Sequence, residues 1–301
     1  MNRVWEHMSW LASEPRPAET DRLEECRRYC IQHLNDCGWD VRRDPFTSHN
    51  SIGFSLNGVN LVGHRRVPES SSARNDRPVF VLGAHLDSCP GTPGADDNAS
   101  AVAALLDVAA AITEEFPVES WNQCPVELEL VIFDLEENGM LGAAFHADGC
   151  RQQQRNVLGM VSLEMLGYCS RQPGSQSMPP ELQGIYSDVG NFIGVVGNQN
   201  STALIQHFAD AFASIPDLPR ESLQVPDNGR PLPPTRLSDH SPFWDAGYPA
   251  LMITDTSFLR NPHYHEPTDT PETLDPVFLT KVTAGVIVAV RKLLQSGLRS
   301  G

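Results

Sequence analysis

Short apolar runs alternate along this chain with longer segments in which hydrophobic residues recur at helical spacing. Residues 79–83 form a continuous apolar run, which is typical of a strand buried on both faces. Residues 20–37 place apolar side chains on one helical face, and Thr20 is suited to cap that helix. The same patterns predict strands at residues 39–46, 79–83, 126–133, 157–163, 193–196 and 249–254, and helices at residues 20–37, 97–115, 141–154, 202–212 and 275–294.

The alternation of predicted strands and helices favours one fold class. Strands separated by helices pair in parallel, and the helices then cover both faces of the sheet. We therefore predict an α/β protein with three α/β/α layers and a central, mostly parallel mixed sheet. A chain of 301 residues can form one large domain of this kind, so we expect residues 1–301 to be a single domain.

Two long segments carry no clear pattern. Residues 170–191 contain several Gly, Pro and Ser residues, and residues 215–237 contain six prolines. Long irregular loops in a compact domain are either functional or disordered, so these segments are interpreted as walls or lids of a pocket, with flexible insertions as the alternative. A third, shorter segment at residues 69–77 is polar and is predicted to be a loop.

The composition and charge of the chain disfavour several classes of function. The chain has 22 basic and 38 acidic residues, a net charge of −16, which disfavours binding to nucleic acid or to an anionic membrane surface. No apolar run is long enough to span a bilayer, and the polar residues near the N-terminus do not fit a secretory signal, so a cytoplasmic location is expected. The seven cysteines contain no CxxC pair and are interpreted as reduced thiols.

The residues that could carry chemistry follow the predicted strands. Ligands of doubly wound sheets bind outside the carboxyl ends of the strands, so side chains at these positions converge. Two histidines and several carboxylates at one place describe a metal site with nitrogen and oxygen ligands, and zinc suits such a site, with manganese or cobalt as alternatives. The clusters are His85 with Asp87, Asp96 with Asp97, Glu136 with Glu137, Glu164, and His263 with His265.

Other catalytic patterns do not occur. The chain has no HExxH, no GxSxG and no GxxxxGK[ST] segment. The contiguous residues Ser238, Asp239 and His240 cannot converge as a catalytic triad requires. The metal site is therefore the leading interpretation.

Six segments in order resemble one known family. They read GAHLDS, PGADDNAS, FDLEENGMLGA, LEMLGY, SDHSPFWDAGYPALMITDT and NPHYHEPTDTPETLD, and with their intervals they extend over nearly the whole chain. They are similar to the co-catalytic di-zinc aminopeptidases, the bacterial leucyl aminopeptidase-like metallopeptidases. That family shares a clan with glutamate carboxypeptidases and glutaminyl cyclases.

The resemblance implies a set of metal ligands. His85 and Glu164 would bind one zinc, His265 and Glu137 the other, and Asp97 would bridge the two. Many family members have Asp at the position of Glu164, and the longer side chain can still reach a metal. The three carboxylates, a bridging hydroxide and two Zn²⁺ sum to zero charge, as a partly buried site requires. The family pattern also implies a cis peptide after Asp97.

The remaining implied roles concern proton transfer and positioning. Glu136 would be the general acid and base, taking a proton from the metal-activated water and passing it to the leaving amine. Asp87 would orient His85 by a hydrogen bond. His240 and Tyr264 are candidate donors to the oxyanion or the substrate, with a packing role as the alternative for His240.

We therefore expect a zinc-dependent exopeptidase with a peptide substrate, foremost an aminopeptidase, because an acidic pocket suits a cationic N-terminus. A carboxypeptidase or dipeptidase stays open, since Arg260 or Arg236 could bind a substrate carboxylate. A single-zinc acyltransferase like the glutaminyl cyclases is a further alternative, as is a degenerate, non-catalytic binding or scaffold domain. The sequence makes no prediction of oligomeric state.

Overall fold

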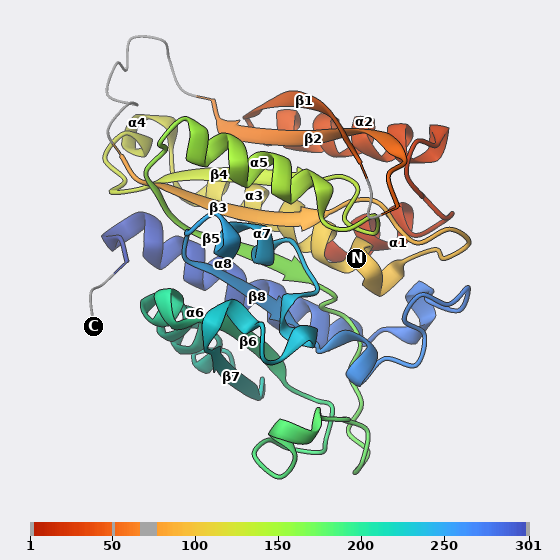
Figure 1. The fold of residues 1–301 in the computed structure, drawn as a ribbon. Helices are drawn as coiled ribbons and strands as arrows, with labels where there is room; N and C mark the ends of the chain where they lie inside the picture. Colours follow the sequence, from red (N-terminus) through yellow and green to blue (C-terminus); the bar gives the residue numbers. More distant parts are fainter. Residues whose placement is uncertain (1–2, 50–51, 67–76, 299–301) are drawn as a thin grey trace.

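A mixed sheet of eight strands forms the centre of the computed structural model, which describes residues 3–49, 52–66 and 77–298 (Figure 1). The strand order is β1-β2-β4-β3-β5-β8-β6-β7. Strands β4, β3, β5 and β8 are parallel, whereas β1, β2 and β6 join antiparallel neighbours. The strands are β1 (Trp39–His49), β2 (Ser55–Arg65), β3 (Val79–His85), β4 (Glu127–Phe133), β5 (Val157–Glu164), β6 (Ile193–Asn198), β7 (Arg220–Val225) and β8 (Ala250–Thr254).

Helices cover both faces of this sheet, so the predicted three-layer α/β/α architecture is confirmed. One face carries α1, α2, α3, α6 and α8 over the larger of two hydrophobic clusters. The other face carries α5 and α7 over the smaller cluster. The helices are α1 (Arg3–Leu11), α2 (Asp21–Asp36), α3 (Ala101–Glu115), α4 (Val118–Trp121), α5 (Leu141–Gln152), α6 (Thr202–Ala213), α7 (His240–Asp245) and α8 (Pro276–Ser296).

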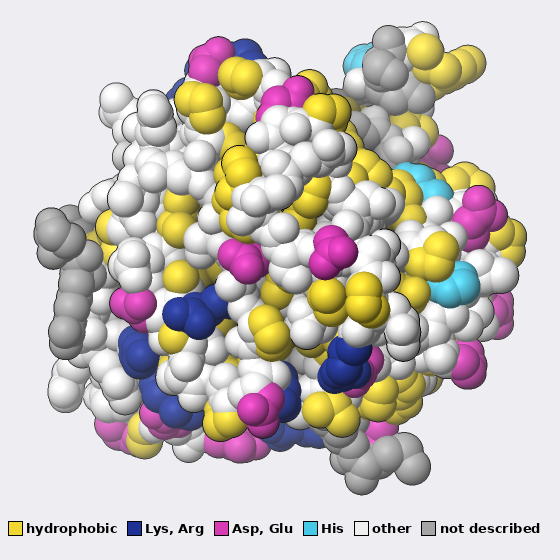
Figure 2. All heavy atoms as spheres, turned by 90° about the horizontal axis from the view of Figure 1, so that it is seen from below, with side chains coloured by type: hydrophobic (Ala, Val, Ile, Leu, Met, Phe, Trp, Pro, Cys, Tyr) yellow, Lys and Arg dark blue, Asp and Glu magenta, His cyan; other side chains and the backbone are white. Residues whose placement is uncertain are grey.

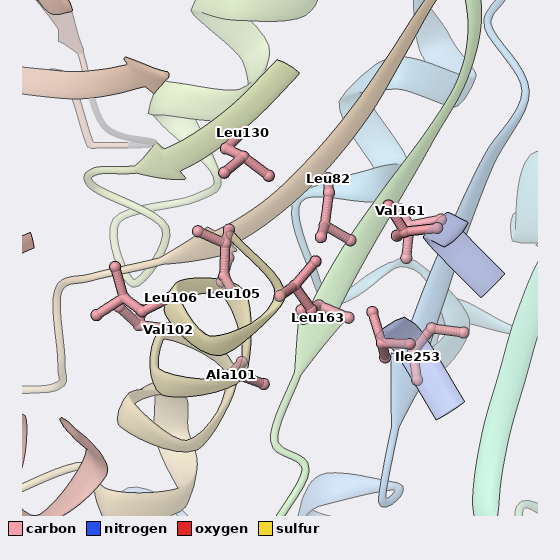
Figure 3. Close-up of a cluster of buried hydrophobic side chains, with 14 of the residues drawn as sticks. Leu82, Ala101, Val102, Leu105, Leu106, Leu130, Val161, Leu163 and Ile253 are labelled. Atoms are coloured by element: carbon pink, nitrogen blue, oxygen red, sulfur yellow. The ribbon is translucent and has the colours of Figure 1, made fainter. Parts of the chain in front are cut away.

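Helix α3 packs directly on the central strands. Figure 3 shows Ala101 and Leu105 of α3 facing Leu82 of β3 and Leu163 of β5, and all four side chains are fully buried. Burying one leucine side chain contributes about 2 kcal/mol, so this contact fixes α3 firmly on the sheet. As a result, the segment before α3 is held at the carboxyl ends of β3 and β5.

Two predicted helices begin directly after a residue that caps them. The Thr20 hydroxyl accepts a hydrogen bond from the Leu23 amide at 3.3 Å, and α2 begins one residue later. Asp275 caps α8 in the same way. The helix predicted from residue 97 instead begins at Ala101, because residues 95–100 form an irregular turn with the expected cis peptide between Asp97 and Asn98.

Five of the described helices and strands were not predicted, namely α1, β2, α4, α7 and β7. Strand β2 contains Gly58, Asn60 and Gly63, which weaken its hydrophobic pattern, and yet Asn60 is fully buried. Its side-chain amide donates to the Gly142 carbonyl, and its side-chain oxygen accepts the Asp134 amide. Strand β7 lies inside the proline-rich segment that was predicted to be irregular. The polar loop predicted at residues 69–77 lies, except for Arg77, outside the described residues.

A buried ion-pair cluster lies between β4 and α5. Glu129 and His146 are almost fully buried, and the His146 ring nitrogen Nε2 is 3.0 Å from Glu129 Oε1. Arg155 donates to both oxygens of the same carboxylate. Burial lowers the pKa of His146, but hydrogen bonds with Cys150 and Glu129 outweigh it and raise the pKa to about 9.

The described surface mixes its side-chain types. Figure 2 shows acidic, basic and apolar side chains interspersed on the face seen from below Figure 1. Within the described part of the chain, none of the helices combines the length and the apolar character that crossing a bilayer requires.

Candidate metal centre and substrate cavity

The carboxyl ends of three neighbouring strands bring the predicted site residues together. His85 is the last residue of β3 and Glu164 is the last residue of β5. Glu136 and Glu137 follow β4, which pairs with β3 in parallel. Ligand sites of open α/β sheets lie at this edge, so the fold itself places these four side chains around one point.

Asp97 lies between the two histidines. Its Oδ1 is 3.3 Å from Nε2 of His85, and its Oδ2 is 3.2 Å from Nε2 of His265. Glu164 Oε2 is 3.5 Å from the His85 nitrogen, and Glu137 Oε2 is 3.2 Å from the His265 nitrogen. The five side chains therefore form two adjacent groups, which share one carboxylate.

The donor atoms of both groups suit a divalent cation. His85 Nε2 is buried and forms no well-directed hydrogen bond with a described residue, although the carboxylate oxygens of Asp97 and Glu164 lie 3.3 and 3.5 Å from it. His85, Asp97 and Glu164 offer three ligand atoms that lie within 4.8 Å of one another. Imidazole nitrogen with carboxylate oxygen is a donor set that fits Zn²⁺.

Cys89 joins the second group, which the sequence analysis did not foresee. Its thiol donates to Glu137 Oε2 at 3.0 Å, and its backbone amide donates to Glu137 Oε1 at 2.9 Å. The thiol, Glu137 and His265 can converge on one cation. The signal in the sequence was the position of Cys89 directly after the HLDS segment, four residues beyond His85.

Asp87 is fully buried next to the candidate metal ligands. Its two carboxylate oxygens each accept a backbone amide at 3.1 Å, from Glu136 and from Glu137. His85 Nδ1 lies 3.1 Å from the backbone oxygen of Asp87 and 3.7 Å from its carboxylate. The hydrogen bond that orients His85 is thus made by the Asp87 main chain, while the carboxylate holds the two glutamate amides.

The turn that carries Asp97 is held from behind by Asp269. The carboxylate of Asp269 accepts the amides of Asp96 and Asp97 at 3.0 and 3.1 Å. The side chain of Asn98 bonds to the main chain of Leu163 and of Met165 at the end of β5. Asp269 lies 172 residues beyond Asp97 and was not among the predicted site residues.

A buried arginine fixes the loop between β3 and this turn. Arg16 is completely buried, and its guanidinium donates to the backbone carbonyls of Leu86, Pro93 and Gly94. A rigid fork of donors suits three carbonyls in fixed positions. The loop that contains Asp87 and Cys89 is therefore tied down at both of its ends.

The electrostatics of the site reflect crowding of carboxylates. Burial raises the pKa of Glu136 well above its usual range, and the charges of Glu164 and Asp239 add to the shift, although His85 opposes it. Burial also raises the pKa of Asp97, but its hydrogen bonds with His265 and His85 outweigh burial and lower it. Burial and the neighbouring carboxylates therefore both favour a proton on Glu136.

The two candidate substrate-contact residues lie in different surroundings. Tyr264 lines the cavity beside the metal groups and stacks on His265, with ring centroids 3.7 Å apart. His240 is fully buried at the start of α7, where it donates to the Thr235 carbonyl and contacts the edge of Trp244. The ring of His240 does not line the cavity, so the geometry gives no support to an oxyanion role for it.

A cavity of about 250 Å³ opens beside these carboxylates. Segments 178–186, 232–237 and 256–259 contribute its walls together with β6, β7 and β8, and most of the lining is apolar. Among the described residues, no lysine or arginine lines the cavity. Arg260 is buried and bonds to Gln176, and Arg236 pairs with Asp245.

Fold and site together are those of a metallopeptidase, and the chain belongs to a defined family. A family model described as Peptidase family M28 matches residues 64–290. The chain is 33% identical over 301 residues to the uncharacterized protein YfbL of Escherichia coli, covering 92% of this chain and 89% of that protein. It is 24% identical to leucine aminopeptidase 1 of Trichoderma harzianum, covering 83% of this chain but only 58% of the relative.

Solved structures share the fold. A zinc aminopeptidase from Bacillus subtilis superposes with a TM-score of 0.74 at 15% identity, covering 97% of this chain and 95% of the other. A glutaminyl cyclase from Porphyromonas gingivalis superposes with a TM-score of 0.72 at 16% identity, covering 96% of this chain and 97% of the other. At 15–16% identity, these structural similarities establish the fold of the chain but not its reaction.

Proposed function

We propose that this protein is a zinc-dependent aminopeptidase that removes N-terminal residues from peptides. The observation that carries the proposal is the position of Asp97, with one carboxylate oxygen near each of His85 and His265. A carboxylate in this position can join two cations about 3.5–4 Å apart, the separation typical of two-metal hydrolases.

The proposed ligand sets follow from the two groups. His85 and Glu164 would hold one zinc ion, His265 and Glu137 the other, and Asp97 would bind both. Three carboxylates lower the charge of two Zn²⁺ from +4 to +1 before any solvent or substrate binds. That remaining charge supports binding of a polarised carbonyl oxygen at the same place.

When bound, the zinc pair would supply Lewis-acid activation of water and of the substrate carbonyl. Glu136, 3.9 Å from His85 Nε2, would accept the proton of the attacking water and deliver it to the departing amine. The Asp87 carboxylate would keep Glu136 in place through the amide it accepts. The Tyr264 hydroxyl would donate toward the developing oxyanion.

The cavity favours an aminopeptidase over a carboxypeptidase. A carboxypeptidase needs a cation for the substrate carboxylate, whereas Arg260 and Arg236 are engaged elsewhere and do not line the cavity. The carboxylates of Glu136, Glu137 and Glu164 do line it and suit a free ammonium group.

The glutaminyl cyclase alternative differs in the number of metals. A single-metal site would not need Asp97 to face both histidines, so the geometry supports two metals. A non-catalytic scaffold would be expected to have lost a ligand or the base, and all of the proposed residues are present.

The test combines a metal count with kinetics. Atomic emission should give two zinc equivalents per chain, and aminoacyl-p-nitroanilides should be hydrolysed while N-acetylated analogues are not. Glu136→Gln should lower kcat by 100-fold or more at unchanged metal content, because it removes the proton acceptor. Glu119→Gln, at an exposed position on α4, is the matched control. Full activity of Glu136→Gln, or hydrolysis of the blocked analogues, would refute the proposal.

A further inference from the structure

A row of register partners runs across the sheet from the metal groups to its edge. Glu164 of β5 pairs with Thr254 of β8, Thr254 pairs with Gly194 of β6, and Gly194 pairs with Glu221 of β7. Register partners point to the same face of a sheet, and all four residues line the cavity. With neighbouring strands about 4.8 Å apart, Glu221 lies roughly 14 Å along the row from Glu164.

The next row of the sheet gives the cavity an apolar floor. Met252, Val196 and Leu223 are register partners on β8, β6 and β7, and all three line the cavity. In the first row Gly194 has no side chain, and a Cβ there would lie 3.2 Å from the Thr254 carbonyl oxygen, so a larger residue would crowd this part of the lining. The cavity thus extends over a mostly apolar floor from the carboxylates of the candidate metal ligands to Glu221, all of which line it.

Glu221 carries a charge without a counter-ion. It is half-buried on the edge strand, and no described lysine, arginine or histidine lies within 4.0 Å of its carboxylate. Tyr186 lies nearby, where its hydroxyl donates to the Ser222 carbonyl at 3.0 Å. Tyr186 and Glu221 both line the cavity, and burial, followed by the charge of Glu221, raises the pKa of Tyr186.

We propose that Glu221 determines specificity by binding the cationic side chain of an N-terminal arginine or lysine. This inference rests on the proposed aminopeptidase function. A carboxylate beside an aromatic ring in a mostly apolar cavity suits a long aliphatic stem with a positive tip.

The distance along the row fits such a side chain. An extended arginine side chain of about 7 Å and a charge-assisted hydrogen bond of about 3 Å together cover about 10 Å, most of the distance along the row. A leucine side chain is too short to approach Glu221. A phenylalanine would fill the cavity but would leave the carboxylate without a partner.

The test compares substrates that differ only in charge. The p-nitroanilides of arginine, lysine, citrulline and leucine would be assayed with the zinc-loaded protein. Citrulline has the shape of arginine without its charge, so arginine should exceed citrulline in kcat/KM by 10- to 100-fold. Glu221→Gln should lower kcat/KM for arginine and lysine by 10- to 100-fold, mainly through KM, and leave leucine within twofold.

Glu181→Gln is the matched control, since Glu181 is exposed in the 178–186 wall and does not line the cavity. An equal loss for arginine and leucine in Glu221→Gln, or equal rates for arginine and citrulline, would overturn the inference. If no aminoacyl substrate is hydrolysed, the proposed function fails instead. Calorimetry with L-arginine and L-citrulline then tests the binding role of Glu221 without hydrolysis. The inference requires that arginine binds more tightly than citrulline and that Glu221→Gln abolishes this difference.

Discussion

Replacing Asp87 by asparagine tests how the site is held together. In the native protein each oxygen of the buried carboxylate accepts one backbone amide, from Glu136 and from Glu137. Asparagine has the same shape but only one acceptor oxygen, so its NH₂ group must face one of the two amides. One hydrogen bond to a charged acceptor is lost and one buried N–H is left without a partner.

The expected loss can be estimated from these contacts. A hydrogen bond to a charged group contributes about 1.5–3 kcal/mol. The Asp87 charge also raises the pKa of the buried carboxyls of Asp134 and Asp239, beyond the larger effect of burial on each, so removing it relieves some repulsion. We expect the free energy of unfolding of the metal-free protein to fall by about 2 kcal/mol. Zinc affinity should fall by about 10- to 100-fold, because ligand orientation is relaxed.

Urea unfolding followed by tryptophan fluorescence measures the first quantity, and competition with a chromophoric chelator measures the second. Asp148→Asn is the control, since Asp148 is an exposed residue of α5 with a side chain that is 57% exposed. A loss of stability below about 0.5 kcal/mol together with unchanged zinc affinity would show that the Asp87 carboxylate does not hold the glutamate segment.

Three further predictions concern residues around the site and the core. Arg16→Lys cannot keep all three carbonyl contacts and should reduce the free energy of unfolding by about 2–4 kcal/mol in urea titrations, whereas the exposed Arg66→Lys should change it by less than about 0.5 kcal/mol. Gly94→Ala should cost at least about 2 kcal/mol in the same assay, because Gly94 has φ of 62° and a Cβ would lie 2.1 Å from the Asp97 carbonyl oxygen. The pKa of His146 is about 9 in the folded protein and near 6.5 in the unfolded chain, so the protonated ring stabilises the fold fully below pH 6.5. This stabilisation is lost as the pH rises from 6.5 through 9, and the free energy of unfolding should decline by up to about 3 kcal/mol over that interval. That decline should be absent in His146→Gln, and a parallel decline in both proteins would contradict the assignment.

Local signals in the sequence identified most of the regular elements. The apolar run at residues 79–83 forms β3, and Thr20 caps α2 as predicted. The helix predicted from residue 275 begins one residue later, because Asp275 is its cap. Strand β7 was missed because its polar residues alternate at an exposed edge between prolines. Strand β2 was missed because its buried position depends on Asn60 bonding to residues that lie 74 and 82 positions away.

The sequence by itself determined which residue types stand at the strand ends, and therefore that carboxylates and histidines could meet at one edge of an α/β sheet. The tertiary structure decided how they meet, with Asp97 between two histidines, Asp269 behind its turn, Cys89 beside Glu137 and Glu221 in the lining of the cavity. Propensities act over a few neighbouring residues, whereas these contacts join segments up to 173 positions apart. Their partners are set by the strand order of the sheet, which no local pattern contains.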